Sequence, residues 1–235
     1  MIKKGTEKQR LKQIGLFGAL YLISTLLIVP FIAPVFGREK IKESEVVSAH
    51  SLFYKLANRN YVNPELNKAI QNIAKQFEQK NSRIKLKYLD ANFPFINKFP
   101  LLPHLSHNDG KKIDVSLIYS DNKGQLTNKK KSVSGYGVFE GPKNQEFDQI
   151  SVCKEKGNWL YDFPKYLTLG TVNKSVDFSE SATRELVNII VNQNEIGKLF
   201  IEPHLKTRMN LNSGKVRFHG CKAVRHDDHI HFQLK

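Results

Sequence analysis

The end of the chain concentrates residues that bind metal ions. Residues 225–234 read Arg-His-Asp-Asp-His-Ile-His-Phe-Gln-Leu, with three histidines and two aspartates. Neutral imidazole and carboxylate are ligands that zinc takes from proteins, and a catalytic zinc needs only three of them, which leaves a position for water. This composition indicates a metal site rather than a solvated surface.

A second group of candidate ligands lies in the middle of the chain. His107 and Asp114 are seven residues apart and flank Gly110. A glycine tolerates a positive φ angle, which lets a loop fold back over an ion bound at the following strand. His107, Asp114 and His231 are therefore the predicted zinc ligands.

Strand alternation explains how the two groups could meet. Successive side chains of a β-strand point to opposite faces. In 228–234, His229 and His231 share one face and the apolar residues share the other. In 113–119, Asp114 likewise lies opposite the apolar face. Pairing of these two strands is predicted to bring Asp114 beside His231.

The two motifs resemble those of the penicillin-insensitive murein endopeptidases, within the wider LAS group of zinc peptidases. In that family a His-x-x-Gly-x-x-x-Asp element supplies two zinc ligands, here His107 and Asp114, and a C-terminal His-x-His supplies the third, here His231. The endopeptidase branch is also similar in its His-Asp-x-His-x-His form, which places further active-site histidines at His226 and His229. The resemblance covers roughly the C-terminal half of the chain, and motif order and separation both agree.

The chain departs from the family pattern near the first ligand. The family usually has serine two residues before it, where this chain has Leu105 and keeps Ser106 directly before His107. Lys112 stands where the family has a small or apolar residue. These differences concern the position of the loop rather than the ligands.

The resemblance implies metal-assisted hydrolysis of a peptide bond, in which zinc lowers the pKa of a bound water toward about 7. His229 lies roughly 6.5–7 Å along the strand from His231 and on the same face, and is the predicted general base and proton donor. His226 is the second choice, and could instead stabilise the oxyanion or orient His229. Asp227 or Asp228 could hold an imidazole tautomer.

The remaining candidates are weaker. His204 and His219 are predicted to be structural or exposed, and His104, three residues before His107, is the one other histidine expected near the metal, outside its direct ligands. Glu202 is a weak alternative base, because its distance in sequence from the motifs leaves its position open.

The N-terminal region reads as a membrane segment. Residues 14–37 carry no charge and exceed the roughly 20 residues needed to cross the hydrocarbon core. A signal peptide has a shorter apolar region, of about 7–15 residues, and an Ala-x-Ala-like end. Five basic residues precede the segment, against three diluted by glutamates after it, so the N-terminus is predicted to stay in the cytoplasm.

These observations divide the chain into a cytoplasmic tail (1–13), a transmembrane anchor (14–37), a stalk (38–60) and a zinc peptidase domain (61–235). The composition, 40% hydrophobic and 25% charged, is ordinary for a globular domain. The expected fold is α+β, with an antiparallel sheet and flanking helices of the LAS zinc peptidase kind after one N-terminal transmembrane helix. The chain is placed in the cytoplasmic (inner) membrane as a single-pass protein, with its catalytic domain in the periplasm.

Local patterns predict the elements that position the site. A helix begins after Asn63, a good N-cap, with Pro64 at its first position. A second helix spans 179–192, and strands are expected over 83–89 and 199–201.

The segment 125–168 reads as an insertion with a cluster of aromatic residues. These aromatics could stack on sugar rings, but a small local core is the favoured interpretation. The cluster comprises Trp159, Tyr161, Phe163 and Tyr166. Cys153 and Cys221 could pair in an oxidising compartment, or remain as two buried thiols.

The formal net charge of +15 would normally indicate a nucleic acid partner. Export argues against that class, and anionic lipid head groups and an acidic cell-wall polymer fit the charge better. The predicted function is zinc-dependent hydrolysis of peptide cross-links in peptidoglycan. The alternatives are a D-Ala-D-Ala carboxypeptidase or dipeptidase, and a non-catalytic zinc-containing module that binds the cell wall, in which His229 or His226 would fill the fourth zinc position.

Overall fold

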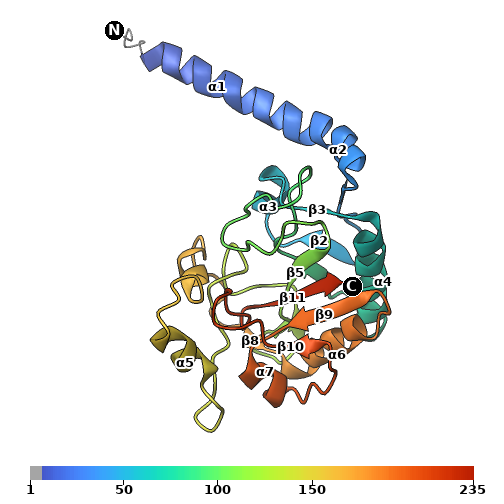
Figure 1. Ribbon diagram of the computed structural model, residues 1–235, viewed down its shortest axis with the longest axis vertical. Helices are drawn as coiled ribbons and strands as arrows, with labels where there is room; N and C mark the ends of the chain where they lie inside the picture. Colours follow the sequence, from blue (N-terminus) through green and yellow to red (C-terminus); the bar gives the residue numbers. More distant parts are fainter. Residues whose placement is uncertain (1–6) are drawn as a thin grey trace.

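The computed structural model describes residues 7–235, in which a long apolar helix projects from a mixed α+β domain (Figure 1). Residues 1–6 of the predicted tail lie outside the described residues. The helix runs over Glu7–Phe36 and is long and apolar enough to cross a membrane, so it begins before the predicted 14–37. Its parts are α1 (Glu7–Ile23), the π-helical η1 (Ser24–Ile28), α2 (Val29–Ile32) and the 3-10 turn η2 (Ala33–Phe36).

Helix η2 ends at Gly37, which has a φ angle of 68°. A left-handed residue at this position is a common helix stop, and glycine adopts it without a steric penalty. The helix also touches the domain along its C-terminal half. Tyr21 donates a hydrogen bond to the Leu56 carbonyl (2.7 Å), and Asn58 donates one to the Thr25 hydroxyl (3.1 Å).

The domain is built on a six-stranded sheet with the order β10-β9-β11-β5-β4-β2. Its central pairs, β9 with β11, β11 with β5 and β5 with β4, are antiparallel as predicted. Its strands are β2 (Val47–Ala49), β4 (Leu86–Tyr88), β5 (Lys112–Ser116), β9 (Ile196–Phe200), β10 (Val216–Arg217) and β11 (His229–Leu234).

Both outer pairs of this sheet, β2 with β4 and β9 with β10, are parallel. The sheet is therefore mixed, which corrects the expectation of an antiparallel sheet. A parallel neighbour needs a crossover connection, usually a helix. Here α4 (Pro64–Lys80) lies between β2 and β4 in the chain, and α7 (Pro203–Arg208) lies between β9 and β10.

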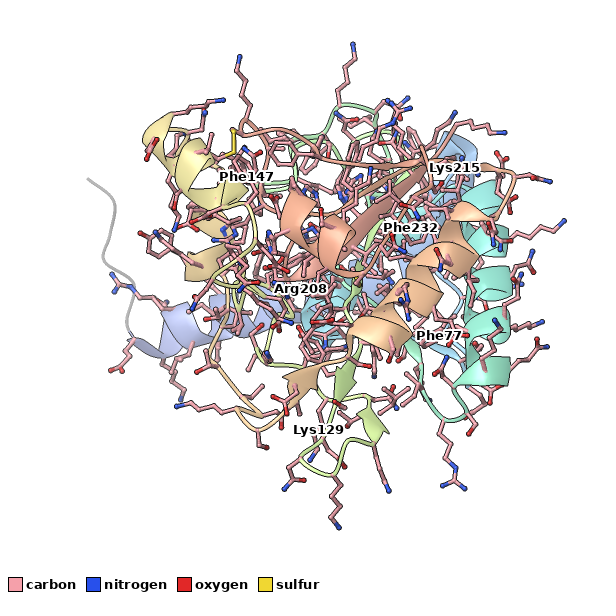
Figure 2. The ribbon with its side chains drawn as sticks, turned by 90° about the horizontal axis from the view of Figure 1, so that it is seen from below. Phe77, Lys129, Phe147, Arg208, Lys215 and Phe232 are labelled. Atoms are coloured by element: carbon pink, nitrogen blue, oxygen red, sulfur yellow. A yellow bond between two sulfur atoms is a disulfide. The ribbon has the colours of Figure 1, made fainter. Side chains whose placement is uncertain are left out.

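Helix α4 and helix α6 (Glu180–Val191) contact each other and lie on the same side of the sheet (Figure 1). The Asn63 side chain accepts a hydrogen bond from the Leu66 amide (2.9 Å), which confirms the predicted N-cap. Phe77 of α4 and Phe232 of β11 are fully buried in the resulting core (Figure 2). The apolar face of β11 thus anchors the core, which frees its other face for polar groups.

The segment 38–60 does not stand apart from the domain as the predicted stalk. It contributes strand β2 to the sheet, and Val47 and Tyr54 are almost completely buried. Its apolar residues are spread among charged ones, so its composition does not indicate a strand of the sheet. Its other elements are β1 (Glu39–Lys40) and α3 (Leu52–Leu56), and β1 pairs with β3 (Tyr61–Val62), which directly follows the segment.

The predicted insertion forms a lobe beside the sheet. Its elements are β7 (Leu126–Thr127), α5 (Gln149–Glu155) and the 3-10 turn η3 (Phe163–Tyr166). Outside the insertion, β6 (Tyr119–Ser120) pairs with both β7 and β8 (Asp177–Phe178). A disulfide joins Cys153 to Cys221, and a small core surrounds it. Tyr161 belongs to this core, whereas Trp159 and Tyr166 are 68% and 71% exposed. The expected local core therefore holds for only part of the aromatic cluster.

Burial of Val47 gives a test of this domain boundary. Val47→Ala removes two buried methyl groups and is expected to lower the free energy of unfolding by about 2 kcal/mol. Glu45→Ala, in the same segment but exposed to solvent, is the control and should change it by less than about 0.5 kcal/mol. Denaturant titration of the full chain in detergent measures both values. Equal stability of the two variants would instead support the predicted stalk at 38–60.

Candidate metal centre

Strands β5 and β11 bring the two sequence motifs together. Their antiparallel register places His231 opposite Asp114 and His229 opposite Ser116. Directly opposed residues point to the same face of a sheet, so Asp114 and both histidines share one face. This confirms the predicted pairing of Asp114 with His231. All three side chains are buried in the middle of the sheet.

His107 reaches this face from the loop before β5. Gly110 has a φ angle of 79°, a conformation that favours glycine, and a Cβ atom there would also displace the Arg38 guanidinium, which lies 2.4–2.5 Å from that position. The Asn92 side chain accepts a hydrogen bond from the Gly110 amide (3.0 Å). His107 Nδ1 bonds to the Ala91 carbonyl (2.9 Å), which can only accept. This bond leaves the lone pair on Nε2, directed at Asp114.

The three predicted ligands form a compact set of donor atoms. His107 Nε2 lies 3.1 Å from Asp114 Oδ1 and 3.0 Å from His231 Nδ1, and His231 Nδ1 lies 2.9 Å from the same oxygen. Donors bonded to zinc at about 2.0–2.2 Å lie roughly 3–3.5 Å from one another. The residues His107, Asp114 and His231 could therefore hold a metal ion.

The charges of this set suit a cation. Burial disfavours ionisation of Asp114, but the surrounding His107, His229 and His104 outweigh it and hold the pKa of Asp114 well below its usual range. Burial lowers the pKa of His231 to about 3, so this imidazole is neutral and can offer a lone pair. The pKa of His107 is raised, because attraction to Asp114 outweighs burial. A bound cation would oppose that protonation.

His104 forms a second group with Asp114 and His229, in which donor atoms lie within 4.8 Å of one another. The sequence placed His104 near the metal but outside its ligands. The side chain is 4% exposed, and its Nδ1 lies 2.9 Å from Asp90 Oδ2 and 3.5 Å from Asp114 Oδ2. His104 is therefore a candidate ligand in its own right.

His229, the predicted base, is held by the carboxylate that precedes it. Its Nδ1 lies 2.5 Å from Asp228 Oδ1, and the other oxygen of Asp228 accepts a hydrogen bond from the Gly137 amide (2.5 Å). Nε2 of His229 lies 3.7 Å from Asp114 Oδ2. Of the two aspartates considered from the sequence, Asp228 fixes the tautomer, whereas Asp227 pairs with Arg225 (2.5 and 2.7 Å).

The pKa of His229 is raised to about 9 in the metal-free chain. Burial would lower it, but the carboxylates of Asp114 and Asp228 outweigh burial. A cation bound to Asp114 would cancel much of the attraction between Asp114 and the protonated His229. It would therefore lower the pKa of His229 and favour its neutral form, which can act as a base.

His226 occupies the position next to His229. The two ring centroids are 4.8 Å apart, and burial together with His229 lowers the pKa of His226 well below its usual range. Glu202, the alternative base, accepts hydrogen bonds from the His226 amide (3.0 Å) and from the Tyr161 hydroxyl (2.8 Å). Both of its oxygens are thus engaged, so Glu202 positions His226.

A small cavity of about 160 Å³ gives access to the centre. Four histidines line it: His104, His219, His226 and His231. No sequence pattern placed His219 at the centre, because this residue lies in an irregular segment after β10. Its ring stacks on Phe200, with centroids 4.1 Å apart, and lies 5.9 Å from the ring of His231. The available sequence signal for this loop is Cys221, because its disulfide to Cys153 attaches the loop to the insertion.

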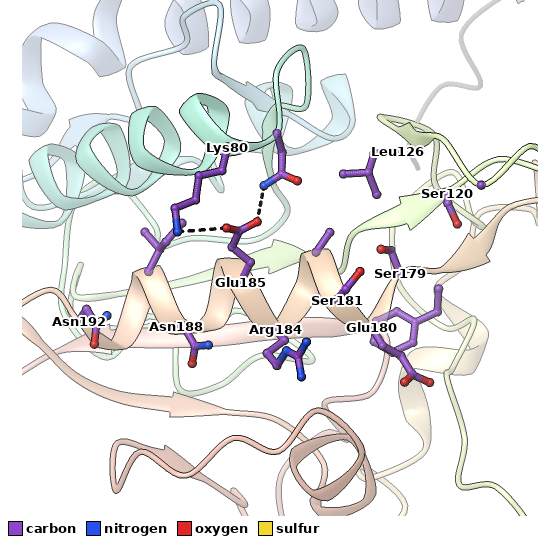
Figure 3. Close-up of a pocket in the computed structure, with 15 residues that line it drawn as sticks. Lys80, Ser120, Leu126, Ser179, Glu180, Ser181, Arg184, Glu185, Asn188 and Asn192 are labelled. Carbon is purple, nitrogen blue, oxygen red and sulfur yellow. Dashed lines mark hydrogen bonds and ion pairs between the residues drawn. The ribbon is translucent and has the colours of Figure 1, made fainter.

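A wider hollow between α4 and α6 lies apart from these histidines (Figure 3). Glu185 there pairs with Lys80 (3.2 Å) and accepts a hydrogen bond from Asn81 (2.7 Å). The described lining of this hollow includes no candidate ligand from the two motifs. The site is therefore the buried centre on the sheet and not this wider surface hollow.

Comparisons of the chain with protein-family models and with curated proteins found no match. Its function is therefore inferred from the geometry of the centre and from the motifs that build it.

Removal of one ligand gives the first test of the centre. His231→Ala is expected to lose more than about 100-fold in zinc affinity, because even groups that only orient ligands contribute about 10–100-fold. His50→Ala, which removes a histidine outside the centre, is the control and should bind zinc as the unmodified chain does. Competition titration against a chromophoric chelator measures both, and unchanged affinity of His231→Ala would remove it from the ligand set.

Asp228 should control the protonation of His229. In the metal-free chain, Asp228→Asn is expected to lower the pKa of His229 from about 9, because the carboxylate charge is lost. A folded pKa above the ordinary 6.5 stabilises the fold fully below pH 6.5, and this contribution disappears as the pH rises through about 9. The variant should lose less stability over that interval. Histidine NMR titration measures the pKa, with Asp121→Asn, in a partly exposed turn outside the centre, as control.

Proposed function

We propose that this protein is a membrane-anchored zinc peptidase that hydrolyses peptide bonds in peptidoglycan, with the peptide cross-links as its substrate. The observation that carries the proposal is the arrangement around Asp114. Three donor atoms lie 2.9–3.1 Å apart, and a carboxylate-held imidazole, His229, lies beside them on the same strand face. A cluster that only stabilised the fold would not need a third histidine with a free ring nitrogen.

Zinc is the proposed metal because two imidazoles and one carboxylate leave a position open, as in catalytic zinc sites. The same ligand set also binds iron(II) in some proteins, so elemental analysis of the purified chain is the direct check. When bound, zinc supplies a polarised carbonyl and a water whose pKa falls to about 7.

The residues of the chain supply the proton transfers. His229 Nε2 takes the proton from the attacking water, and Asp228 stabilises the resulting imidazolium through Nδ1. The same nitrogen then gives the proton to the amine that leaves. His226 lines the cavity and is available to donate a hydrogen bond to the carbonyl oxygen as negative charge develops there. Glu202 holds His226 through its backbone amide.

The substrate class rests on the motifs and on the location they imply. The chain carries the His-Asp-x-His-x-His form similar to that of murein endopeptidases, at 226–231. The long apolar N-terminal helix and the Cys153–Cys221 disulfide both agree with a domain exported into an oxidising compartment. Branches that act on D-Ala-D-Ala ends commonly use a glutamate as base. Glu202 does not take that place, which favours the endopeptidase.

Incubation of the full chain in detergent with purified peptidoglycan tests this proposal. We expect cross-linked muropeptide dimers to fall to monomers with zinc, and to persist with a chelator, when the products are identified by mass spectrometry. Loss of a terminal alanine instead would show a carboxypeptidase. No change in the presence of stoichiometric zinc would show a wall-binding module with a structural ion.

The role of His229 is tested by His229→Asn. Asparagine keeps an N–H that can bond to Asp228 but removes the ring nitrogen that carries the proton, so we expect hydrolysis to fall by about 100-fold or more while tight zinc binding persists. His50→Asn is the matched control. Loss of the tight zinc together with activity would instead make His229 a ligand of the first ion, which contradicts the assignment as base.

A further inference from the structure

The two oxygens of Asp114 face different pairs of histidines. Oδ1 lies 3.1 Å from His107 Nε2 and 2.9 Å from His231 Nδ1. Oδ2 lies 3.5 Å from His104 Nδ1 and 3.7 Å from His229 Nε2. One carboxylate therefore stands between two potential coordination sets, and only the first is used by the proposed zinc.

Neighbouring carboxylates fix the tautomers of the second set, and in His104 the hydrogen lies on Nδ1, the nitrogen nearest to Asp114 Oδ2. His104 Nδ1 bonds to Asp90 Oδ2 (2.9 Å), and His229 Nδ1 bonds to Asp228 Oδ1 (2.5 Å). A carboxylate only accepts, so each Nδ1 carries the hydrogen and each neutral ring keeps its lone pair on Nε2. Carboxylates hold the imidazoles of metal sites in this way.

Both of these Nε2 atoms are buried, and within residues 7–235 neither has a hydrogen-bond partner. A buried polar atom without a partner costs free energy, which a ligand can recover. His104 also lines a second small cavity, of about 130 Å³, together with Asp90 and Tyr136.

We infer that the centre takes a second divalent cation of the zinc class, held by His104, His229 and Asp114 Oδ2, so that Asp114 bridges two ions. Shared ligands are compatible with two-metal sites, in which the ions lie about 3.5–4 Å apart. The negative charge of Asp228, which is hydrogen-bonded to the ligand His229, offsets part of the added charge, whereas Asp90 is already paired with Arg59.

The second ion is expected to bind more weakly than the first. The nearest nitrogens of His104 and His229 lie 3.5 and 3.7 Å from Asp114 Oδ2, whereas the donor atoms of the first set lie 2.9–3.1 Å apart. The Tyr136 hydroxyl also donates a hydrogen bond to Asp114 Oδ2 (2.7 Å), which occupies part of that oxygen. Binding therefore requires both imidazoles to move inward and the ring of His104 to turn its Nε2 toward Asp114.

Occupation of the second site has a consequence for catalysis that rests on the proposed function. The lone pair of His229 Nε2 cannot both bind an ion and accept a proton. Excess zinc should therefore inhibit hydrolysis by removing the base, while the first ion stays in place. Zinc would act on this enzyme as cofactor at low concentration and as inhibitor at high concentration.

The test is zinc stoichiometry of the full chain in detergent, measured by titration calorimetry with zinc chloride and by elemental analysis after equilibrium dialysis. We expect two zinc ions per chain, one tight and one weak. His104→Asn keeps an N–H for Asp90 but lacks Nε2, and should bind only the tight ion. His50→Asn is the control and should bind two. Melting temperatures of the chelated proteins show whether each variant is folded.

Several results would overturn the inference. One zinc per chain in the unmodified protein would do so, and so would a weak ion that persists in His104→Asn. If His104→Asn does not fold, His229→Asn removes the other imidazole and makes the same prediction. Stoichiometry does not depend on turnover, so an inactive protein that binds two ions would refute the peptidase and retain the second site. An active enzyme that binds one ion and is not inhibited by zinc would retain the peptidase and refute the second site.

Discussion

The carboxylate of Asp114 is the group around which the rest of the centre is organised. It lies fully buried in the middle of a sheet, and it stays ionised because four histidines surround it. A buried charge without partners would cost several kcal/mol, so the fold must supply compensation close at hand. A cation bound to this carboxylate would complete that compensation. The buried charge of Asp114 thus costs folding free energy, and buried charges of this kind cluster at functional sites.

A second layer of polar residues supports the first. Asp90 holds His104 and is itself paired with Arg59, while Asp228 holds His229. Each pairing satisfies a buried group and also sets which ring nitrogen is available. The geometry of the centre therefore depends on residues that are not themselves candidate ligands. The same arrangement leaves Nε2 atoms without partners, which is consistent with a site built to receive a ligand.

The peripheral elements restrict access to the centre. The disulfide between Cys153 and Cys221 ties the insertion to the loop that carries His219, and that loop lines the small cavity over the candidate ligands. Arg225 contacts both Asp227 and Asp162, and so connects the last motif to the insertion. The exposed Trp159 and Tyr166 extend this lobe into solvent. The apolar helix leaves the domain through Gly37, next to the folded segment that follows it.

Local rules were sufficient for features encoded within a few residues. The alternation in β5 and β11 predicted their inward and outward faces, and their register confirmed that Asp114 meets His231. The cap at Asn63 and the long apolar N-terminal helix are equally local, because a capping side chain and a run of uncharged residues act on their own neighbourhood.

Long-range packing decided the remainder. Residues 38–60 join the sheet because β4 offers an edge to β2, which no local pattern in that polar segment reveals. His104 and His219 reach the centre through loops whose paths depend on the whole domain, and the choice of Asp228 over Asp227 depends on where Arg225 lies. The sequence by itself determined which chemical groups are available and which strand face they occupy. Only the tertiary structure decided which groups meet, because contacts between distant segments depend on the burial of every element at once.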